Sequence, residues 1–214
     1  MGLRRSLACR SGSSRWSDPA FGSIARMKRE RAKLPEGFVL PARLVHGICH
    51  YHRQWIPADE RGFRSRGHRI HSSGDYKNPP PENEHEGLRR WVNDHITGEP
   101  VRLNDEQCAA VGAAFVEKLH RMHCTVIVLA CGPSHLHVEF EPTEENVMRQ
   151  LGKAKQFASL KCPNHSGQLW AELSEVISIK DDNHANEVFG YIDEHRAEGA
   201  WIWRIYVNET VRRV

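Results

Sequence analysis

Two histidines separated by one residue, His135 and His137, have a spacing that indicates chemistry. Side chains two positions apart on a β-strand point to the same side, so both imidazoles could bind one cation. The segment His135–Glu141 alternates polar and apolar residues and predicts such a strand, with Glu139 on the histidine side. The alternative is an ordinary strand surface, because the chain has 14 histidines and this spacing alone is a weak signal.

A second pair of reactive side chains, Tyr191 and His195, lies near the end of the chain. Residues four apart are neighbours on a helix, and Phe189 and Ile192 mark the apolar face of the helix predicted here. The phenol and the imidazole would then project together from the edge of that buried stripe. The alternative is a tyrosine and a histidine at the surface with no shared role.

Taken together, the two pairs predict metal-assisted phosphoryl chemistry. His195 would be a third ligand to a cation held by His135 and His137, and the remaining coordination positions would accept a phosphate oxygen. Tyr191 would then be the nucleophile, since a phenol with a pKa near 10 needs electrophilic help or a base to attack at neutral pH. A covalent phosphotyrosine conserves the energy of a phosphodiester bond for rejoining, which strand transfer requires.

The rest of the chain predicts one domain that positions these residues. It has 214 residues, which is enough to bury a core, and no apolar run approaches the ~20 residues of a membrane span. The 6 cysteines include no pair spaced as CxxC, which favours reduced thiols and a cytoplasmic protein. Residues 1–36 hold 9 Lys and Arg against 3 Asp and Glu. We expect a disordered basic tail there, which is also compatible with translation starting at Met27.

Hydrophobic periodicity predicts an α+β fold for residues 37–214. The order is β-α-β-β-α-β followed by a helix, which is the ferredoxin-like arrangement with helices on one face and a C-terminal catalytic helix. A long loop-rich insertion, about 51–103, follows the first strand. The predicted strands are Ala42–His50, Cys124–Cys131, His135–Glu141 and Glu175–Lys180, and the predicted helices are Asn104–His120, one capped by Thr143, and about His184–Ala197 capped by Asp182 or Asn183.

The sequence resembles the single-tyrosine HUH (His–hydrophobic–His) transposases, the family of the small insertion-sequence and REP-associated tyrosine transposases. GPSHLHVEF after a hydrophobic strand resembles the metal-binding motif, and EVFGYIDEH resembles the helix that carries the catalytic tyrosine in a Tyr-Ile pair. MRQLGKAKQFASLK matches the lysine-bearing helix between them. The resemblance covers about Leu44–His195. Two departures are Gly132-Pro133-Ser134 for the usual Met-Pro-Asn, and His195 where insertion-sequence members have a glutamine ligand.

The resemblance implies a DNA transposase that cleaves and rejoins single-stranded or hairpin DNA with Mg²⁺ or Mn²⁺. Imidazole ligands suit Mn²⁺ better than Mg²⁺. The insertion-sequence enzymes are dimers and REP-associated members can act as monomers, so a homodimer stays open. Candidate phosphate contacts are Lys153, Lys155, Lys161, Arg64 and Arg66, together with Arg61, His68 and Arg69.

Several alternatives stay open from the sequence. A domesticated or inactive nucleic-acid-binding module would use the same fold. A zinc protein is suggested by Cys162 and His165, although no second pair completes a four-ligand site. Tyr51, Tyr76 and Tyr206 are rival nucleophiles without a histidine four residues on. Glu139 is expected at the surface, and Trp170 is expected to anchor packing.

Overall fold

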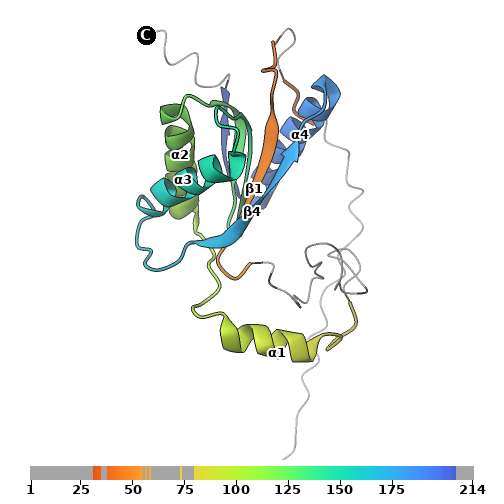
Figure 1. Cartoon of the computed structure of the whole chain (residues 1–214), viewed down its shortest axis with the longest axis vertical. Helices are drawn as coiled ribbons and strands as arrows, with labels where there is room; N and C mark the ends of the chain where they lie inside the picture. The colour runs from red at the N-terminus through yellow and green to blue at the C-terminus, as the bar shows by residue number, and fades with distance from the viewer. Residues whose placement is uncertain are drawn as a thin grey trace, which may run out of the picture. The chain divides into compact units, whose positions relative to one another are not determined.

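The structure is a computed structural model that describes residues 31–34, 38–54, 56, 58, 73 and 80–205. Five strands of this part form one antiparallel sheet in the order β4-β1-β3-β2-β5 (Figure 1). The α+β class expected from the sequence is confirmed. The strands are β1 (Val45–Tyr51), β2 (Thr125–Cys131), β3 (His135–Glu141), β4 (Trp170–Ser178) and β5 (Trp201–Arg204). The helices are α1 (Glu86–His95), α2 (Asp105–Arg121), α3 (Val147–Ser159), α4 (Asp182–Glu194) and the 3₁₀ helix η2 (His195–Glu198).

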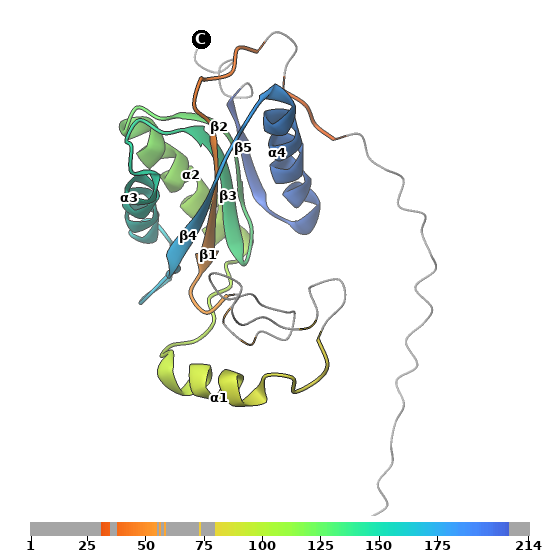
Figure 2. The ribbon, with the colours of Figure 1, turned by 45° about the vertical axis from the view of Figure 1, so that its right-hand side comes forward.

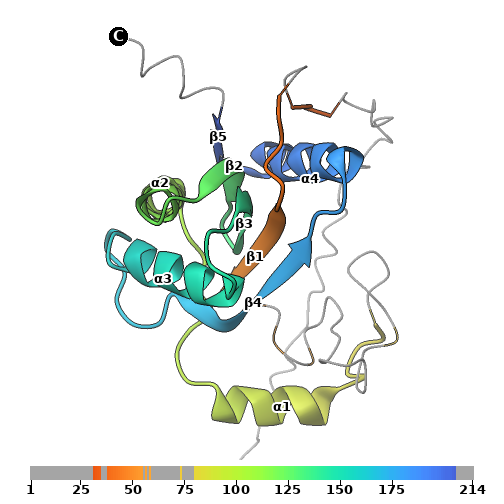
Figure 3. The same ribbon diagram turned by 45° about the horizontal axis from the view of Figure 1, so that its top comes forward.

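Helices cover both faces of this sheet. Figures 2 and 3 show α2 and α3 side by side on one face and α4 on the other. The first face carries the larger apolar core, in which Phe115 of α2 and Leu151 of α3 pack against Phe140 of β3, all fully buried. Phe189 and Ile192 of α4 pack against β2 in a second core. The polar side of β3 therefore lies under a helix and not in open solvent.

Local sequence signals explain where most of these elements begin. The side chain of Asn104 accepts from the backbone of Gln107, whose own side chain accepts from the backbone of Asn104, and this reciprocal capping box starts α2 as predicted. The predicted cap of the next helix, Thr143, is wrong. Its hydroxyl donates to the carbonyl of Met122, and Asn146 caps α3 instead.

The C-terminal part differs from the prediction in its boundaries. Strand β4 begins at Trp170 instead of Glu175. Asp181 caps α4 through the backbone N–H of His184, so neither Asp182 nor Asn183 is the cap. The helix ends at Glu194, where the chain tightens into η2 and then turns through Gly199, which has a left-handed φ of 84°.

Two described elements were not predicted. Helix α1 lies within the segment expected to be a loop-rich insertion, and β5 forms from the Trp-rich segment Trp201–Arg204 by pairing with β2. The ring of Trp201 packs closely on α2 at Gly112, where an added Cβ would meet Trp201 Cε3 at 2.4 Å. A residue with a Cβ atom at position 112 would therefore clash with the indole of Trp201.

The short described segment at the N-terminal side contacts α4. The guanidinium of Arg31 pairs with Glu194 at 2.9 Å, and the backbone N–H of Leu34 donates to Asn186 at 3.1 Å. Both residues belong to the region predicted as a basic tail. None of the described helices has the length and apolar character needed to cross a membrane.

Candidate metal centre and nucleophile

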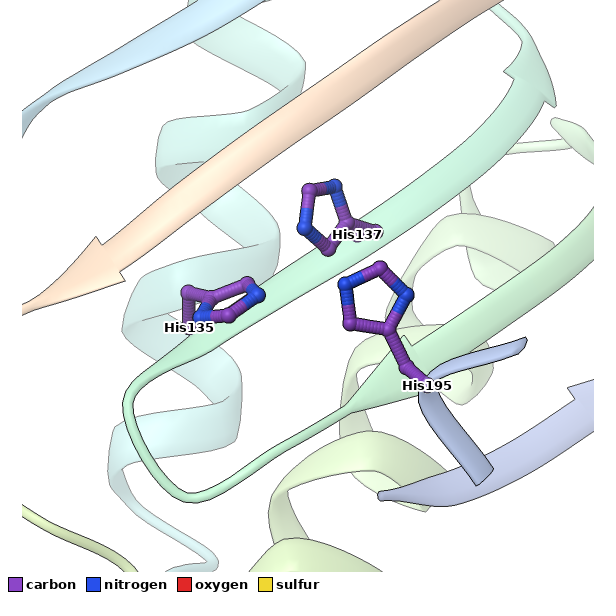
Figure 4. A group of neighbouring side chains, drawn as sticks. All are labelled: His135, His137 and His195. Carbon is purple, nitrogen blue, oxygen red and sulfur yellow. The ribbon is translucent and has the colours of Figure 1, made fainter. Parts of the chain in front are cut away.

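Three histidines meet on the α4 side of the sheet. His135 and His137 come from β3, and His195 comes from the junction of α4 with η2. One ring nitrogen from each residue lies within 4.8 Å of the others (Figure 4). These are the three residues that the sequence predicts as metal ligands. Their imidazoles could hold a divalent ion, and the described residues contain no other group of three metal-ligating side chains that meets the same distance.

Each of these three rings has its Nδ1 atom engaged. His195 Nδ1 donates to the backbone carbonyl of Tyr191 at 3.0 Å, because a carbonyl oxygen can only accept. His135 Nδ1 lies 2.8 Å from the hydroxyl of Ser134, and His137 Nδ1 lies 2.9 Å from Nε2 of His46. A metal would therefore be bound through the Nε2 atoms, with the Nδ1 partners fixing ring orientation as in known histidine metal sites.

Burial keeps His137 and its neighbour His46 in the neutral form. His137 is 4% exposed, and burial, followed by the neighbouring histidines, holds its pKa well below the usual range. Burial, with His195 and His184, also lowers the pKa of His46 to about 4. Neutral imidazoles carry the lone pair that coordination requires. The donor set fits a divalent cation.

Tyr191 projects from α4 directly beside this cluster. Its ring packs edge-on against His195, with centroids 4.8 Å apart, and against His137 at 5.4 Å. It remains 43% exposed, whereas its helical neighbours Phe189 and Ile192 are fully buried. The i,i+4 geometry predicted from the sequence thus brings the phenol beside the candidate ligands while leaving it accessible to a large substrate.

The rival tyrosines differ in position. Tyr51 is fully buried, with its hydroxyl 3.1 Å from the sulfur of Cys131, and burial raises its pKa well above the usual range. A substrate phosphate cannot reach such a hydroxyl without unfolding the core. Tyr76 and Tyr206 lie outside the described residues.

The expectation that Glu139 lies at the surface is wrong. Its side chain is completely buried because α4 covers this face of β3. Neither carboxylate oxygen has a hydrogen-bond partner among the described residues, and burial raises its pKa to about 8. A neutral carboxylic acid therefore lies two residues from His137, on the same side of the strand.

The candidate DNA contacts fall into three groups. Lys155 is 8% exposed, and its amino group donates to the carbonyls of Ala171 and Glu172 in β4. Lys153 is half-exposed and pairs with Glu144 at 2.6 Å, and Lys161 is exposed on the loop after α3. Arg64 and Arg66, with Arg61, His68 and Arg69, lie outside the described residues.

Two further residues contribute to the surroundings of the site. Trp170 is buried, and its indole N–H donates to the carbonyl of Lys155, so it anchors packing as predicted.

The sequence marks His46 only as part of an alternating strand. Its contact with His137 depends on the β1–β3 register, which aligns Ile48 with His137. Sequence periodicity does not predict which residues of two strands pair.

Comparisons with known proteins include a distant structural likeness. No family model and no curated protein matches the chain. A solved structure described as a REP-associated tyrosine transposase bound to a REP hairpin is similar over 81% of this chain and 74% of that one. The two share 8% sequence identity, and the TM-score is 0.38, below the level that establishes a common fold.

Proposed function

We propose that this protein is a metal-dependent tyrosine transposase that cleaves and rejoins single-stranded or hairpin DNA. The observation that carries the proposal is the accessible phenol of Tyr191, packed against His137 and His195, two of the three candidate ligands. The strand order β4-β1-β3-β2 supports a ferredoxin-like scaffold for this site. The motif and the tyrosine helix resemble those of the single-tyrosine HUH family.

The proposed reaction follows from the positions of these groups. The Tyr191 oxygen attacks the scissile phosphorus and loses its proton, a phosphotyrosine bond forms, and the bond from phosphorus to the leaving sugar oxygen breaks. That oxygen takes up a proton, and attack by a sugar hydroxyl reverses the sequence and rejoins DNA. Bound Mg²⁺ or Mn²⁺ would neutralise charge on the phosphate, with Mn²⁺ better suited to three imidazoles. His135, His137 and His195 would hold it.

A cationic surface on the opposite side of the sheet is the proposed contact for the DNA backbone. Lys118, Arg121 and Lys161 surround the ring of Phe157, with cation-to-centroid distances of 5.1 to 5.9 Å. Arg121 pairs with Glu117, whereas neither lysine forms an ion pair with any described residue. Uncompensated lysines beside an aromatic ring suit phosphate contacts and stacking with single-stranded DNA.

A covalent-trapping experiment tests the proposal. The protein is incubated with Mn²⁺ and labelled single-stranded hairpin DNA from its own flanking sequence, and products are separated on a denaturing gel. We expect a metal-dependent protein–DNA adduct that Tyr191→Phe and His135→Ala both abolish and that His120→Ala, a histidine substitution on α2, retains.

The outcomes separate the candidate functions. An adduct that survives Tyr191→Phe contradicts the assignment of the nucleophile. Binding of hairpin DNA without an adduct from any flanking hairpin contradicts the transposase proposal and favours a nucleic-acid-binding module on the same fold.

A further inference from the structure

His46 is a buried histidine behind the candidate metal centre that the proposed reaction does not use. It lies on β1, is 5% exposed, and faces the same side of the sheet as His137. Its Nε2 atom is 2.9 Å from His137 Nδ1, and the two ring centroids are 5.1 Å apart. The bond joins two strands, so it is not a consequence of local sequence.

This hydrogen bond has two forms, and they differ in what His137 can bind. A hydrogen bond between two neutral imidazoles needs one donor and one acceptor. If His46 donates from Nε2, the proton of neutral His137 resides on its own Nε2, and that atom cannot coordinate a metal. If His137 donates from Nδ1, its Nε2 carries the lone pair instead. Only the second form is compatible with coordination by Nε2.

We propose that His46 is a positioning residue that accepts the Nδ1 proton of His137 and holds the Nε2 lone pair of His137 toward a metal shared with His135 and His195. The inference rests on the proposed metal-dependent function. It assigns to β1 a part in the site, in addition to β3 and the end of α4.

The other two ligands show why His137 needs such a partner. His195 is fixed by a main-chain carbonyl and His135 lies beside the hydroxyl of its chain neighbour Ser134, so both partners are close in sequence. His137 is 4% exposed, so its Nδ1 has little access to water. Without His46, the Nδ1 proton would be buried and unsatisfied, which favours the other tautomer or a rotated ring.

Two substitutions at His46 separate the hydrogen bond from the space that the ring fills. His46→Leu fills much of the volume and removes the acceptor. His46→Gln places an amide oxygen the same number of bonds from the backbone as Nε2, and so restores an acceptor. His120→Leu is the matched control, because His120 lies on α2 and contacts Trp203 instead of the site.

The test is the affinity of the metal-free full chain for Mn²⁺, measured by calorimetry and by the electron paramagnetic resonance signal of free Mn²⁺. We expect His46→Leu to weaken binding roughly 10–100-fold, as is typical for an outer partner of a ligand histidine. His46→Gln should recover most of that loss, and His120→Leu should bind like the wild type. Equal affinity in wild type and His46→Leu overturns the inference, as does equal loss in His46→Leu and His46→Gln.

A second readout does not depend on metal. Histidine nitrogen NMR of the metal-free protein should show His137 protonated on Nδ1 in the wild type and in His46→Gln, but not in His46→Leu. A wild-type His137 protonated on Nε2 in both the free and Mn²⁺-bound protein overturns the inference.

Failure of the proposed function gives a different pattern. If the wild type and His135→Ala both fail to bind Mn²⁺, the metal centre itself is absent and both proposals fall. If the wild type binds Mn²⁺ through the three histidines but forms no DNA adduct, only the transposase proposal falls.

Discussion

His195 donates its Nδ1 proton to the main-chain carbonyl of Tyr191, 3.0 Å away, so the third candidate ligand and the candidate nucleophile are joined by one turn of helix. The bond uses the backbone of Tyr191, not its phenol. Chemistry at the phenol oxygen therefore does not break this hydrogen bond to His195. The two functions of this turn can be tested separately.

Substitutions at these two residues should affect metal binding and chemistry differently. We expect His195→Ala to weaken Mn²⁺ binding by at least the roughly 10–100-fold that removal of an outer partner costs, and His195→Gln to weaken it less because an amide oxygen can coordinate. Tyr191→Phe keeps the main-chain carbonyl and should bind Mn²⁺ like the wild type while forming no adduct. Calorimetric titration measures the affinities. A weakened Tyr191→Phe would show that the phenol itself supports the metal.

The buried Lys155 should matter for stability more than its exposed neighbour. Lys155→Met removes the buried charged donor to the carbonyls of Ala171 and Glu172, and hydrogen bonds to charged groups contribute about 1.5–3 kcal/mol. The matched Lys153→Met removes an exposed ion pair with Glu144, which should cost less because solvent screens that pair. Urea unfolding of both variants measures the difference. Equal free energies of unfolding would contradict a structural role for Lys155.

The buried Glu139 predicts a pH dependence of stability in the metal-free protein. Burial raises its pKa from 4.5 to about 8, so between these values the folded chain retains a proton that the unfolded chain has released. The contribution of Glu139 to stability should therefore fall as pH rises through this interval, by up to about 1.4 kcal/mol per pH unit. Buried His46 acts in the opposite direction below its usual pKa of 6.5, so the comparison with a Glu139 variant isolates the carboxyl group. Glu139→Gln keeps the shape and should remove this fall. Thermal unfolding from pH 5 to 8 in a chelator checks it, and parallel curves for the two proteins would contradict it.

The cationic surface around Phe157 predicts salt-dependent DNA binding. Replacing both Lys118 and Lys161 with alanine should weaken binding of single-stranded DNA and reduce the slope of log affinity against log salt by about 1.4, or ~0.7 for each phosphate that is no longer neutralised. Fluorescence anisotropy at several salt concentrations measures both quantities. Arg90→Ala removes an exposed cation from α1 and is the control. An unchanged slope in the double variant would exclude this surface.

The sequence predicts the site better than it predicts the environment of the site. The spacing of His135 and His137 and of Tyr191 and His195 follows from strand and helix periods, which are local properties. The burial of Glu139 requires α4 to cover β3, and the contact of His46 requires the β1–β3 register. Both features depend on packing between segments that are distant in the sequence. Periodicity predicts only local structure.

Lysine positions illustrate the same limit. Lys153 and Lys155 are two residues apart on α3, and the resemblance places both on a DNA-binding helix. One is half-exposed, whereas the other lies under β4, because a helix turns about 100° per residue and only packing decides which side is covered. Boundaries such as the Asn146 cap also depend on which of several competent side chains meets a free backbone N–H.

Helix α4 follows β4 and precedes β5 in the chain, and this order has a consequence for DNA that has been cut. Both strands belong to the same sheet, and Asp193 at the end of α4 accepts from Arg204 of β5 at 2.7 Å. The C-terminal end of the helix is thus fastened to the strand that follows it in sequence. A DNA end joined to Tyr191 would stay tethered to the polypeptide that cut it, and the histidines that release it would belong to the same molecule. Under the proposed function, one chain carries both the nucleophile and all three candidate metal ligands.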